Sequence, residues 1–431
     1  MKRCKSTEME RYRVIRDATF QSSLLPLILS YLTLQELVLR AGRVAKSWQV
    51  ATTRAAQSCA IGLTINLYRP LDPSKAGWIS RLKSLRRLRI EYPLQQHRKF
   101  LLDILQHNPH LEDLSFFAHV HDCKIDIADL LEAMPNPSLR RFRFMLSRPT
   151  EKEEVELKRT RPYEQDLINV VQKLAHHEHL EYFEWTAKVG VAGDESLTQL
   201  LAQHSNTLEE LVLPPGFGQC RLGLCQAIGK VSRCLTSLEL QEEPAGLTST
   251  GLRSILHCTK LDNLSISDYG DAETGSLTND VFLQLDPLPS LTWLSLGYLG
   301  PDVDETGLKT LLQLCPNLRN LMIDMDAPLG SFVLTVIADT VGPLLEYLSL
   351  GGSADPDKVY NLSDALIFLR SAPNLTHFSS RFLWTPSERD SEAALKFQWN
   401  TIESHGDWTR HVALLYAIQA TPFAKRCKFQ F

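Results

Sequence analysis

The stretch that decides the fold is LRNLMI at residues 318–323, which returns 27 residues later as LEYLSL at residues 345–350. Both copies have leucine at the first and fourth positions and an aliphatic residue at the sixth. The fourth and sixth positions alternate with mostly polar residues at period two, so each copy should form a short strand with one buried side. The pattern therefore predicts one strand per copy.

The same pattern, with similar apolar replacements, occurs eleven times along the chain. Successive copies are 26 to 30 residues apart, except for one gap of 41 residues after the third copy. The copies begin at Leu85, Leu111, Leu139, Leu180, Leu208, Leu235, Leu261, Leu291, Leu318, Leu345 and Leu375. Such regular return at a long period is typical of a repeat protein.

Between the strands lie segments with apolar residues at i, i+3 and i+4, which predict one helix per repeat. Examples are FLLDILQ before His107, LKTLLQL before Cys315 and DALIFLR before Ser371. Several of these segments run into proline, as in CPNL at residues 315–318 and APNL at residues 372–375. Proline should end each helix because it lacks an N–H donor and restricts the residue before it.

Neither strand nor helix can bury its apolar face alone, so consecutive repeats must stack. The repeats resemble the leucine-rich-repeat family, and the Cys-Pro or Asn-Pro before the motif is similar to its intracellular, helix-containing subclasses. The resemblance implies an α/β fold, a leucine-rich-repeat horseshoe, which is a solenoid of strand–helix repeats. A parallel sheet would line one side and helices the other.

The repeat solenoid is expected to span residues 60–382, and the stretch CAIGLTINL near residue 60 offers an additional half-buried strand at its start. The 41-residue gap contains the charged insertion RPTEKEEVELKRTRP at residues 148–162, which is either a solvated loop or a docking loop. The repeat pattern stops after residue 380. Residues 383–431 are expected to form a C-terminal cap over the last repeat.

A second module, expected at residues 17–58, lies between a flexible N-terminal tail at residues 1–16 and the repeats. Its stretch FQSSLLPLILSYLTLQELVLRAGRVAKSWQVA at residues 20–51 is apolar at helical spacing with breaks at Thr33 and Gly42, which predicts two or three short helices. The stretch resembles an F-box in the residues Ile28, Leu29, Tyr31, Leu32, Leu37, Val44, Lys46 and Trp48.

An F-box implies binding to the Skp adaptor of a cullin-RING ubiquitin ligase, with the repeats holding the protein to be ubiquitinated. The residues expected to contact the adaptor are Phe20, Leu24, Leu25, Ile28, Leu29, Tyr31, Leu32, Leu37, Val44 and Trp48. The alternative is a helical cap that merely shields the first repeat. A ligase subunit would leave this apolar surface open, whereas a cap would bury it against the region from Leu63 to Leu88.

Strand alternation also predicts the residues on the concave face of the solenoid, because the residues that flank the fourth and sixth motif positions point away from the core. Along the chain this face should grade from basic to acidic to neutral. The residues expected to contact a target are Arg87, Arg89, Arg141, Arg143, Tyr182, Trp293, Met322 and Tyr347. The aromatic residues and Met322 would be anchors for a protein ligand, unless they cover one another.

The four arginines could accept an acidic or phosphorylated segment through charge-assisted hydrogen bonds, or they could form a merely solvated basic surface. Residues 1–100 hold 19 basic and 6 acidic side chains, whereas the rest of the chain holds 27 basic and 44 acidic ones. We do not expect nucleic-acid binding, because the basic residues lack interleaved aromatics in the sequence and the body is acidic.

The composition excludes several other classes. The 431 residues are 44% hydrophobic and 22% charged, which is ordinary for a globular protein and excludes disorder of the whole chain. The apolar run Leu24–Leu29 is too short for a membrane span, and the polar first residues lack the apolar core of a signal peptide. Nine cysteines scattered from Cys4 to Cys427 fit free buried thiols. We therefore expect a cytoplasmic or nuclear protein without a membrane partner.

Catalytic motifs are absent from the sequence. There is no GxSxG elbow, P-loop or paired-cysteine zinc pattern, and His176, His177 and His179 lack the i, i+4 spacing of a zinc helix. No metal, cofactor or catalytic residue is therefore expected. The sequence predicts a non-catalytic subunit of a Skp-cullin-F-box ligase, namely its substrate-recognition adaptor, with Skp adaptor, cullin scaffold and an unknown target protein as partners. The alternative is a ligase-independent interaction scaffold built from leucine-rich repeats.

Overall fold

The computed structural model describes most of the repeat region. The described residues are 61–68, 79, 82–83, 85–93, 95–118, 126–134, 138–146, 164–186, 191–213, 222–231, 234–242, 253–255, 258, 260–268, 279–283, 287–297, 303–325, 332–352 and 362–380. The expected N-terminal tail, the F-box-like module, the charged insertion at 148–162 and the C-terminal cap lie outside these residues.

Each of the eleven sequence motifs forms a strand, and one further strand precedes them at the position expected near residue 60. The strands are β1 (Ile61–Asn66), β2 (Leu85–Glu91), β3 (Asp113–Ala118), β4 (Arg141–Leu146), β5 (Tyr182–Trp185), β6 (Glu210–Leu213), β7 (Ser237–Glu242), β8 (Asn263–Asp268), β9 (Trp293–Leu296), β10 (Asn320–Met325), β11 (Tyr347–Gly352) and β12 (His377–Ser380). The strand predictions are confirmed.

Helices alternate with these strands along the chain, as the 3.6-residue periodicity predicted. The described helices are α6 (Arg98–His107), α7 (Ile127–Glu132), α9 (Glu164–Leu174), α10 (Val191–Gln203), α11 (Leu222–Val231), α13 (Asn279–Phe282), α14 (Glu305–Leu314), α15 (Phe332–Thr340) and α16 (Leu362–Ser371), with a short 3-10 turn, η2, at Gln95–His97. Among the helices of these residues, none combines the length and the apolar character needed to cross a membrane.

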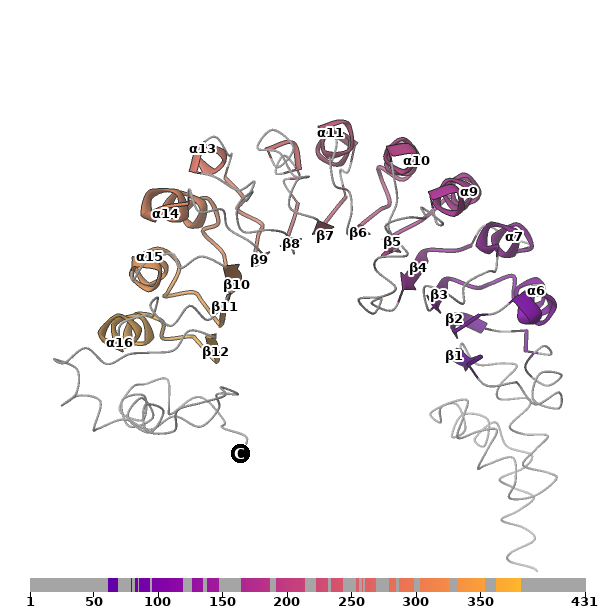
Figure 1. The fold of residues 1–431 in the computed structure, drawn as a ribbon, viewed down its shortest axis with the longest axis horizontal. Coiled ribbons are helices and arrows are strands. Elements are labelled where there is room, and N and C mark those ends of the chain that lie inside the picture. The colour runs from indigo at the N-terminus through magenta and orange to yellow at the C-terminus, as the bar shows by residue number, and fades with distance from the viewer. Residues whose placement is uncertain are drawn as a thin grey trace, which may run out of the picture. The chain divides into compact units, whose positions relative to one another are not determined.

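The chain divides into two compact units, which are described separately. Unit 1 comprises Met1–Thr160 and Gln172–Tyr182, and unit 2 comprises Arg161–Val171 and Phe183–Phe431. In unit 1, β1 to β4 pair in parallel and in chain order. In unit 2, β6 to β12 do the same. Within each unit the strands lie along one side and the helices along the other (Figure 1). The predicted fold class, an α/β solenoid of strand–helix repeats, is confirmed.

The core consists of rows of aliphatic and aromatic residues that run across the strands. In unit 1 the register places Leu88 beside Leu114 and Leu114 beside Phe142, all of them buried. Unit 2 contains the equivalent row Leu264, Leu294, Leu321, Leu348 and Phe378. Because each repeat supplies the same position to the row, every strand completes the core of its neighbours.

The turn from helix to strand is also repeated. In the Cys-Pro repeat, α14 ends at Leu314, and the N–H of Leu318 donates to the carbonyl of Cys315 at 3.1 Å. The same bond joins Leu111 to Asn108, Leu261 to Cys258 and Leu375 to Ala372. The helices α6, α14 and α16 all stop shortly before a proline. The prediction that proline ends these helices is confirmed.

Free buried thiols are found where the structure describes cysteines. Cys225, Cys258 and Cys315 are free and buried, and Cys234 is free and partly exposed. Burial raises the pKa of the Cys258 and Cys315 thiols to about 12. These two side chains therefore act as small apolar residues of the core.

Candidate protein-binding face of the sheet

The predicted arginines of unit 1 share one face of the parallel sheet. Arg87 pairs in register with Asp113, which pairs with Arg141, so these residues form one row across β2, β3 and β4. Arg89, Ser115 and Arg143 form the next row. Their neighbours in sequence, such as Leu88 and Phe142, point into the core on the opposite side and are buried. The period of two thus places all four arginines on the face turned away from the core.

Arg89 differs from the other three because it has a carboxylate partner on its own strand. Its Nε lies 3.0 Å from an oxygen of Glu91, and its guanidinium carbon lies 5.9 Å from the centre of the Phe117 ring. Glu91 also accepts a hydrogen bond from the amide of Asn66 at 3.0 Å. The charge of Arg89 is therefore compensated within the face.

Tyr182 lies beneath two of the arginines. The guanidinium carbons of Arg141 and Arg143 are 5.0 Å and 4.5 Å from the centre of its ring, which is the geometry of a cation–π contact. These contacts cover the tyrosine, whose exposed fraction is only 8%. The expectation that Tyr182 is an exposed anchor is wrong, because two neighbouring strand residues on the same face reach over the ring.

Two of the arginines lack an anionic partner among the described residues. Arg87 is exposed and takes part in no ion pair there. Arg143 contacts the Tyr182 ring, but its buried Nε has no hydrogen-bond partner. Asp113, which stands between Arg87 and Arg141 in the row, instead accepts a hydrogen bond from the Ser115 hydroxyl at 3.2 Å.

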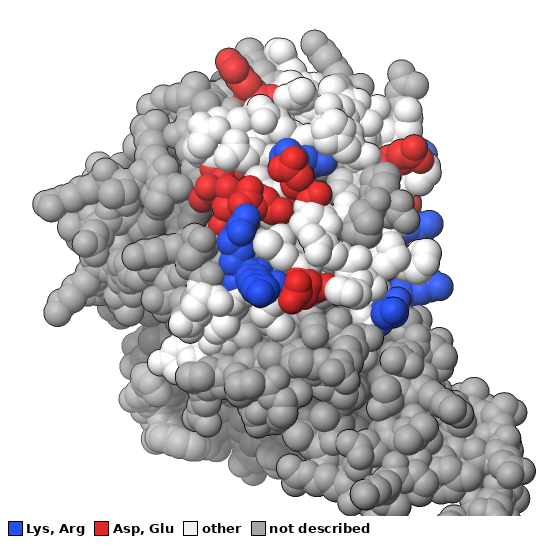
Figure 2. Space-filling model, turned by 90° about the vertical axis from the view of Figure 1, so that its right-hand side faces the viewer, with Lys and Arg blue, Asp and Glu red and all other residues white. Residues whose placement is uncertain are grey.

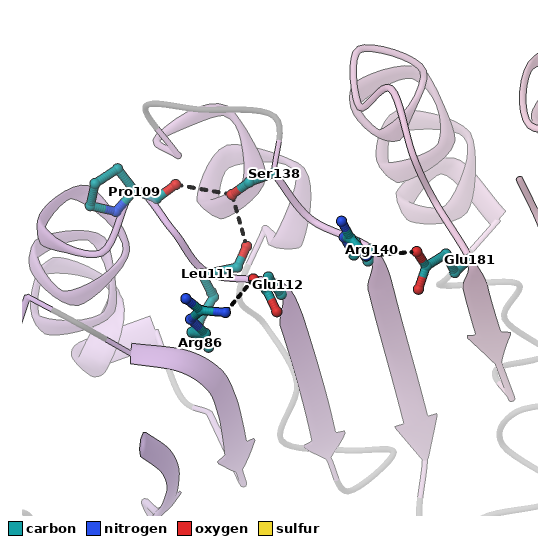
Figure 3. Close-up of polar contacts among 7 residues, drawn as sticks. All are labelled: Arg86, Pro109, Leu111, Glu112, Ser138, Arg140 and Glu181. Atoms are coloured by element: carbon teal, nitrogen blue, oxygen red, sulfur yellow. Dashed lines mark hydrogen bonds and ion pairs between the residues drawn. The ribbon is translucent and has the colours of Figure 1, made fainter. Parts of the chain in front are cut away.

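A different set of arginines is paired at the start of the strands, directly after the first leucine of the motif. Arg86 lies 3.2 Å from Glu112 of the next repeat, and Arg140 lies 3.0 Å from Glu181 (Figure 3). In the same region the Ser138 hydroxyl lies within hydrogen-bond distance of the carbonyls of Pro109 and Leu111. These contacts join successive repeats.

On the helical side of unit 1, ion pairs join Arg98 to Asp129 at 2.7 Å and Lys173 to Glu132 at 2.9 Å. On the side shown in Figure 2, basic side chains lie beside acidic ones and do not form a single large basic patch. Surface pairs of this kind contribute little to stability. Their importance here is that they compensate most arginine charges outside the sheet face.

The sheet face of unit 2 carries stacked aromatic rings. Trp293, Asn320, Tyr347 and His377 are register neighbours on β9 to β12. The rings of Trp293 and Tyr347 are 5.7 Å apart at 25°, and those of Tyr347 and His377 are 4.5 Å apart at 2°. Trp293, Tyr347 and the predicted anchor Met322 are all partly exposed. The aromatic rings thus partly cover one another, and their contact with a target stays a prediction.

Several residues of these faces were missed by the sequence reasoning. Asp113, Ser115 and His377 occupy the same motif positions as the predicted residues, so the repeat alignment alone could have found them. Phe117 lies one position pair further along its strand, beyond the six-residue motif. The ring contacts Tyr68–Tyr92 and Tyr92–Phe117, each at 5.6 Å, depend on strands that are far apart in sequence and left no local signal.

Metal binding finds no site among the described residues, where no group of three or more His, Cys, Asp or Glu side chains could hold an ion. In the His176–His179 cluster, His177 is buried and the other two histidines are exposed. The residues expected to bind the Skp adaptor, from Phe20 to Trp48, lie outside the described part of the chain.

Comparison with known proteins gives no match to a family or to a curated protein. Among solved structures, the chain is similar to one in the complex of Rad7 and Elc1 from yeast, with 16% identity, 90% of this chain and 98% of that chain covered, and a TM-score of 0.41. It is also similar to the leucine-rich repeat-containing protein LegL7 from Legionella pneumophila, with 12% identity, 79% and 99% coverage and a TM-score of 0.39. A Bacteroides fragilis protein has 14% identity, 85% and 80% coverage and a TM-score of 0.27. Function has to be inferred from the chain's own residues.

Proposed function

We propose that this protein is the substrate-recognition adaptor of a Skp-cullin-F-box ubiquitin ligase. Residues 17–58 would bind the Skp adaptor, and the sheet face of the repeats would hold the target protein. The observation that carries the proposal is the F-box-like pattern from Ile28 to Trp48, which directly precedes a repeat solenoid whose first strand begins at Ile61. The protein would be a non-catalytic subunit that works in the cytoplasm or nucleus.

The mechanism would be proximity. Binding of the F-box-like module to the Skp adaptor and cullin scaffold would fix the chain on the ligase. A target held on the sheet face would then be present at high effective concentration near the ubiquitin-charged enzyme. The face supplies residue types that carry interface energy, namely arginines in unit 1 and stacked aromatic rings in unit 2.

The second candidate is a ligase-independent interaction scaffold. The sheet faces of both units support it, because they offer charged and aromatic side chains without any contribution from residues 17–58. The two candidates differ only in what the N-terminal module does.

The first test is a pull-down of purified Skp adaptor with the full-length protein and with the double variant Leu32→Asp, Trp48→Ala. We expect the double variant to lose about tenfold or more of the adaptor affinity, since both residues belong to the apolar surface that would be buried. Leu344→Asp is the matched control, because Leu344 is 46% exposed on the repeats and tolerates a charge. Circular dichroism checks that all proteins stay folded.

Failure of the wild-type protein to bind the adaptor would contradict the ligase proposal and leave the scaffold. Equal loss in the double variant and in Leu344→Asp would also contradict it, because the effect would then not be local to the N-terminal module.

A further inference from the structure

We propose that Arg87, Arg141 and Arg143 on the sheet face of unit 1 bind a phosphorylated segment of a partner protein. The inference specifies the chemistry of the target in the proposed function and rests on it for the word target. The binding itself needs only the repeats.

The three arginines converge because of the repeat register. Arg87 and Arg141 stand in one row on either side of Asp113, and Arg143 lies in the adjacent row beside Ser115. Neighbouring parallel strands are about 4.8 Å apart, so arginines two strands apart can reach groups on one bound peptide segment. Guanidinium groups donate in a planar fork that matches the oxygens of a phosphate.

Two of these side chains are available to a ligand. Arg87 is exposed and has no ion pair among the described residues. Arg143 is partly exposed, and its buried Nε has no hydrogen-bond partner. By contrast, Arg89 in the same rows is held by Glu91 at 3.0 Å.

Tyr182 restrains the other end of the cluster. Its ring lies 5.0 Å from the Arg141 guanidinium carbon and 4.5 Å from that of Arg143. Both guanidinium groups are therefore held in place before a ligand arrives, which reduces the rotamer entropy lost on binding. The tyrosine is a positioning residue in this arrangement.

The charge of the two rows favours a dianion. The four arginines face two carboxylates, Asp113 and Glu91, so two positive charges of the face remain uncompensated. A phosphoserine or phosphothreonine carries about −1.5 to −2 at neutral pH and three strong acceptor oxygens. A single carboxylate would leave part of the positive charge uncompensated.

The rings of the face argue against single-stranded nucleic acid as the ligand. Proteins that bind such strands present open aromatic faces on which bases stack. Here Arg141 and Arg143 lie against the Tyr182 ring, and Arg89 and the edge of Tyr92 lie against Phe117. The carboxylates of Asp113 and Glu91 would also repel a continuous phosphodiester backbone.

The test is a fluorescence-anisotropy titration of the full-length protein with a degenerate peptide pool that has a fixed central phosphoserine. Pools with serine or glutamate at this position are the comparison. We expect the phosphoserine pool to bind about tenfold tighter than the serine pool. The triple variant Arg87→Gln, Arg141→Gln, Arg143→Gln should lose about tenfold or more of this affinity, and Arg87→Gln alone about threefold.

The matched control is the triple variant Arg86→Gln, Arg98→Gln, Arg140→Gln. It removes the same charge from unit 1, but each of its arginines is already in an ion pair, with Glu112, Asp129 and Glu181 respectively. We expect its affinity to stay within about twofold of wild type. The exposed Arg87 keeps the test valid if the face triple variant does not fold.

The proposal is overturned if no pool binds, if all pools bind equally, or if both triple variants lose the same affinity. A thymidine oligonucleotide that binds tighter than the phosphoserine pool and depends on the same three arginines would assign the face to nucleic acid instead. Both arginine variants should still bind the Skp adaptor, so a failure here is distinguishable from a failure of the ligase proposal.

Discussion

Asn108 shows at the scale of one residue how a repeat is joined to its neighbour. It is 1% exposed, and its side-chain oxygen accepts from the N–H of Leu85 at 2.9 Å. Its amide donates to the carbonyls of Leu82 at 2.9 Å and Ile104 at 2.7 Å. One side chain thus satisfies buried backbone groups of two successive repeats, where other repeats use cysteine or alanine at the same turn position.

We predict that Asn108→Ala lowers the free energy of unfolding by about 2–3 kcal/mol, because it leaves buried backbone groups without partners. The measurement is the urea midpoint of unit 1, followed by tryptophan-independent circular dichroism. Asn317→Ala is the control, since exposed Asn317 makes one hydrogen bond, to Pro289 at 2.7 Å. A similar loss in both variants would show that burial of Asn108 is not the cause.

At the scale of the element, local rules explain most of the helix boundaries. Asp304 caps α14 by accepting a hydrogen bond from the Gly307 N–H at 3.0 Å, and Asp126 caps α7 through the N–H of Asp129 at 3.2 Å. Aspartate at the N-cap and proline after the last turn bracket the helix in the sequence itself. The helical patterns were therefore recognisable before the structure was known.

The cap of α14 predicts a pH dependence. The hydrogen bond from Gly307, with help from Asn279, lowers the pKa of the Asp304 carboxyl below its usual 3.8. Because the folded-state pKa is the lower one, the carboxylate stabilises the fold above the unfolded-state pKa, and this contribution is lost as the pH falls through the folded-state pKa.

We expect Asp304→Asn to keep the cap but to flatten the fall in stability below about pH 4. The measurement is the urea midpoint of both proteins between neutral pH and about pH 3. Two curves with the same shape would contradict this role, and Asp304→Ala serves as the variant that lacks the cap at every pH.

At the scale of the whole molecule, each repeat depends on its immediate neighbours. In unit 2 a Cβ added at Gly229 of α11 would lie 1.7 Å from the carbonyl oxygen of Ser254 in the following repeat. At Gly62 of β1 the nearest atom would be the Cβ of Arg87 at 3.7 Å, which is ordinary contact. Glycine is therefore required at the first position and not at the second.

We predict that Gly229→Ala costs about 2 kcal/mol by overpacking and that the damage stays local, because solenoid repeats contact only their neighbours. Hydrogen exchange should rise in β7 and β8 and stay unchanged in β2 and β3. Gly62→Ala should change neither region. A uniform rise of exchange over both units after Gly229→Ala would show that the chain unfolds as one cooperative body.

The sequence by itself determined the number of repeats, the position of each strand and the side of the sheet on which each residue lies. These features follow from periods of two and 3.6 residues and from proline at the turns, all of which act over a few neighbouring residues. Only the tertiary structure decided which arginines are compensated and which rings are covered. Arg89, Arg141 and Arg143 look alike in the repeat pattern, yet Glu91 neutralises the first and Tyr182 holds the other two. The contacts with Tyr182 join residues about 40 positions apart, and they arise only when the strands stack side by side.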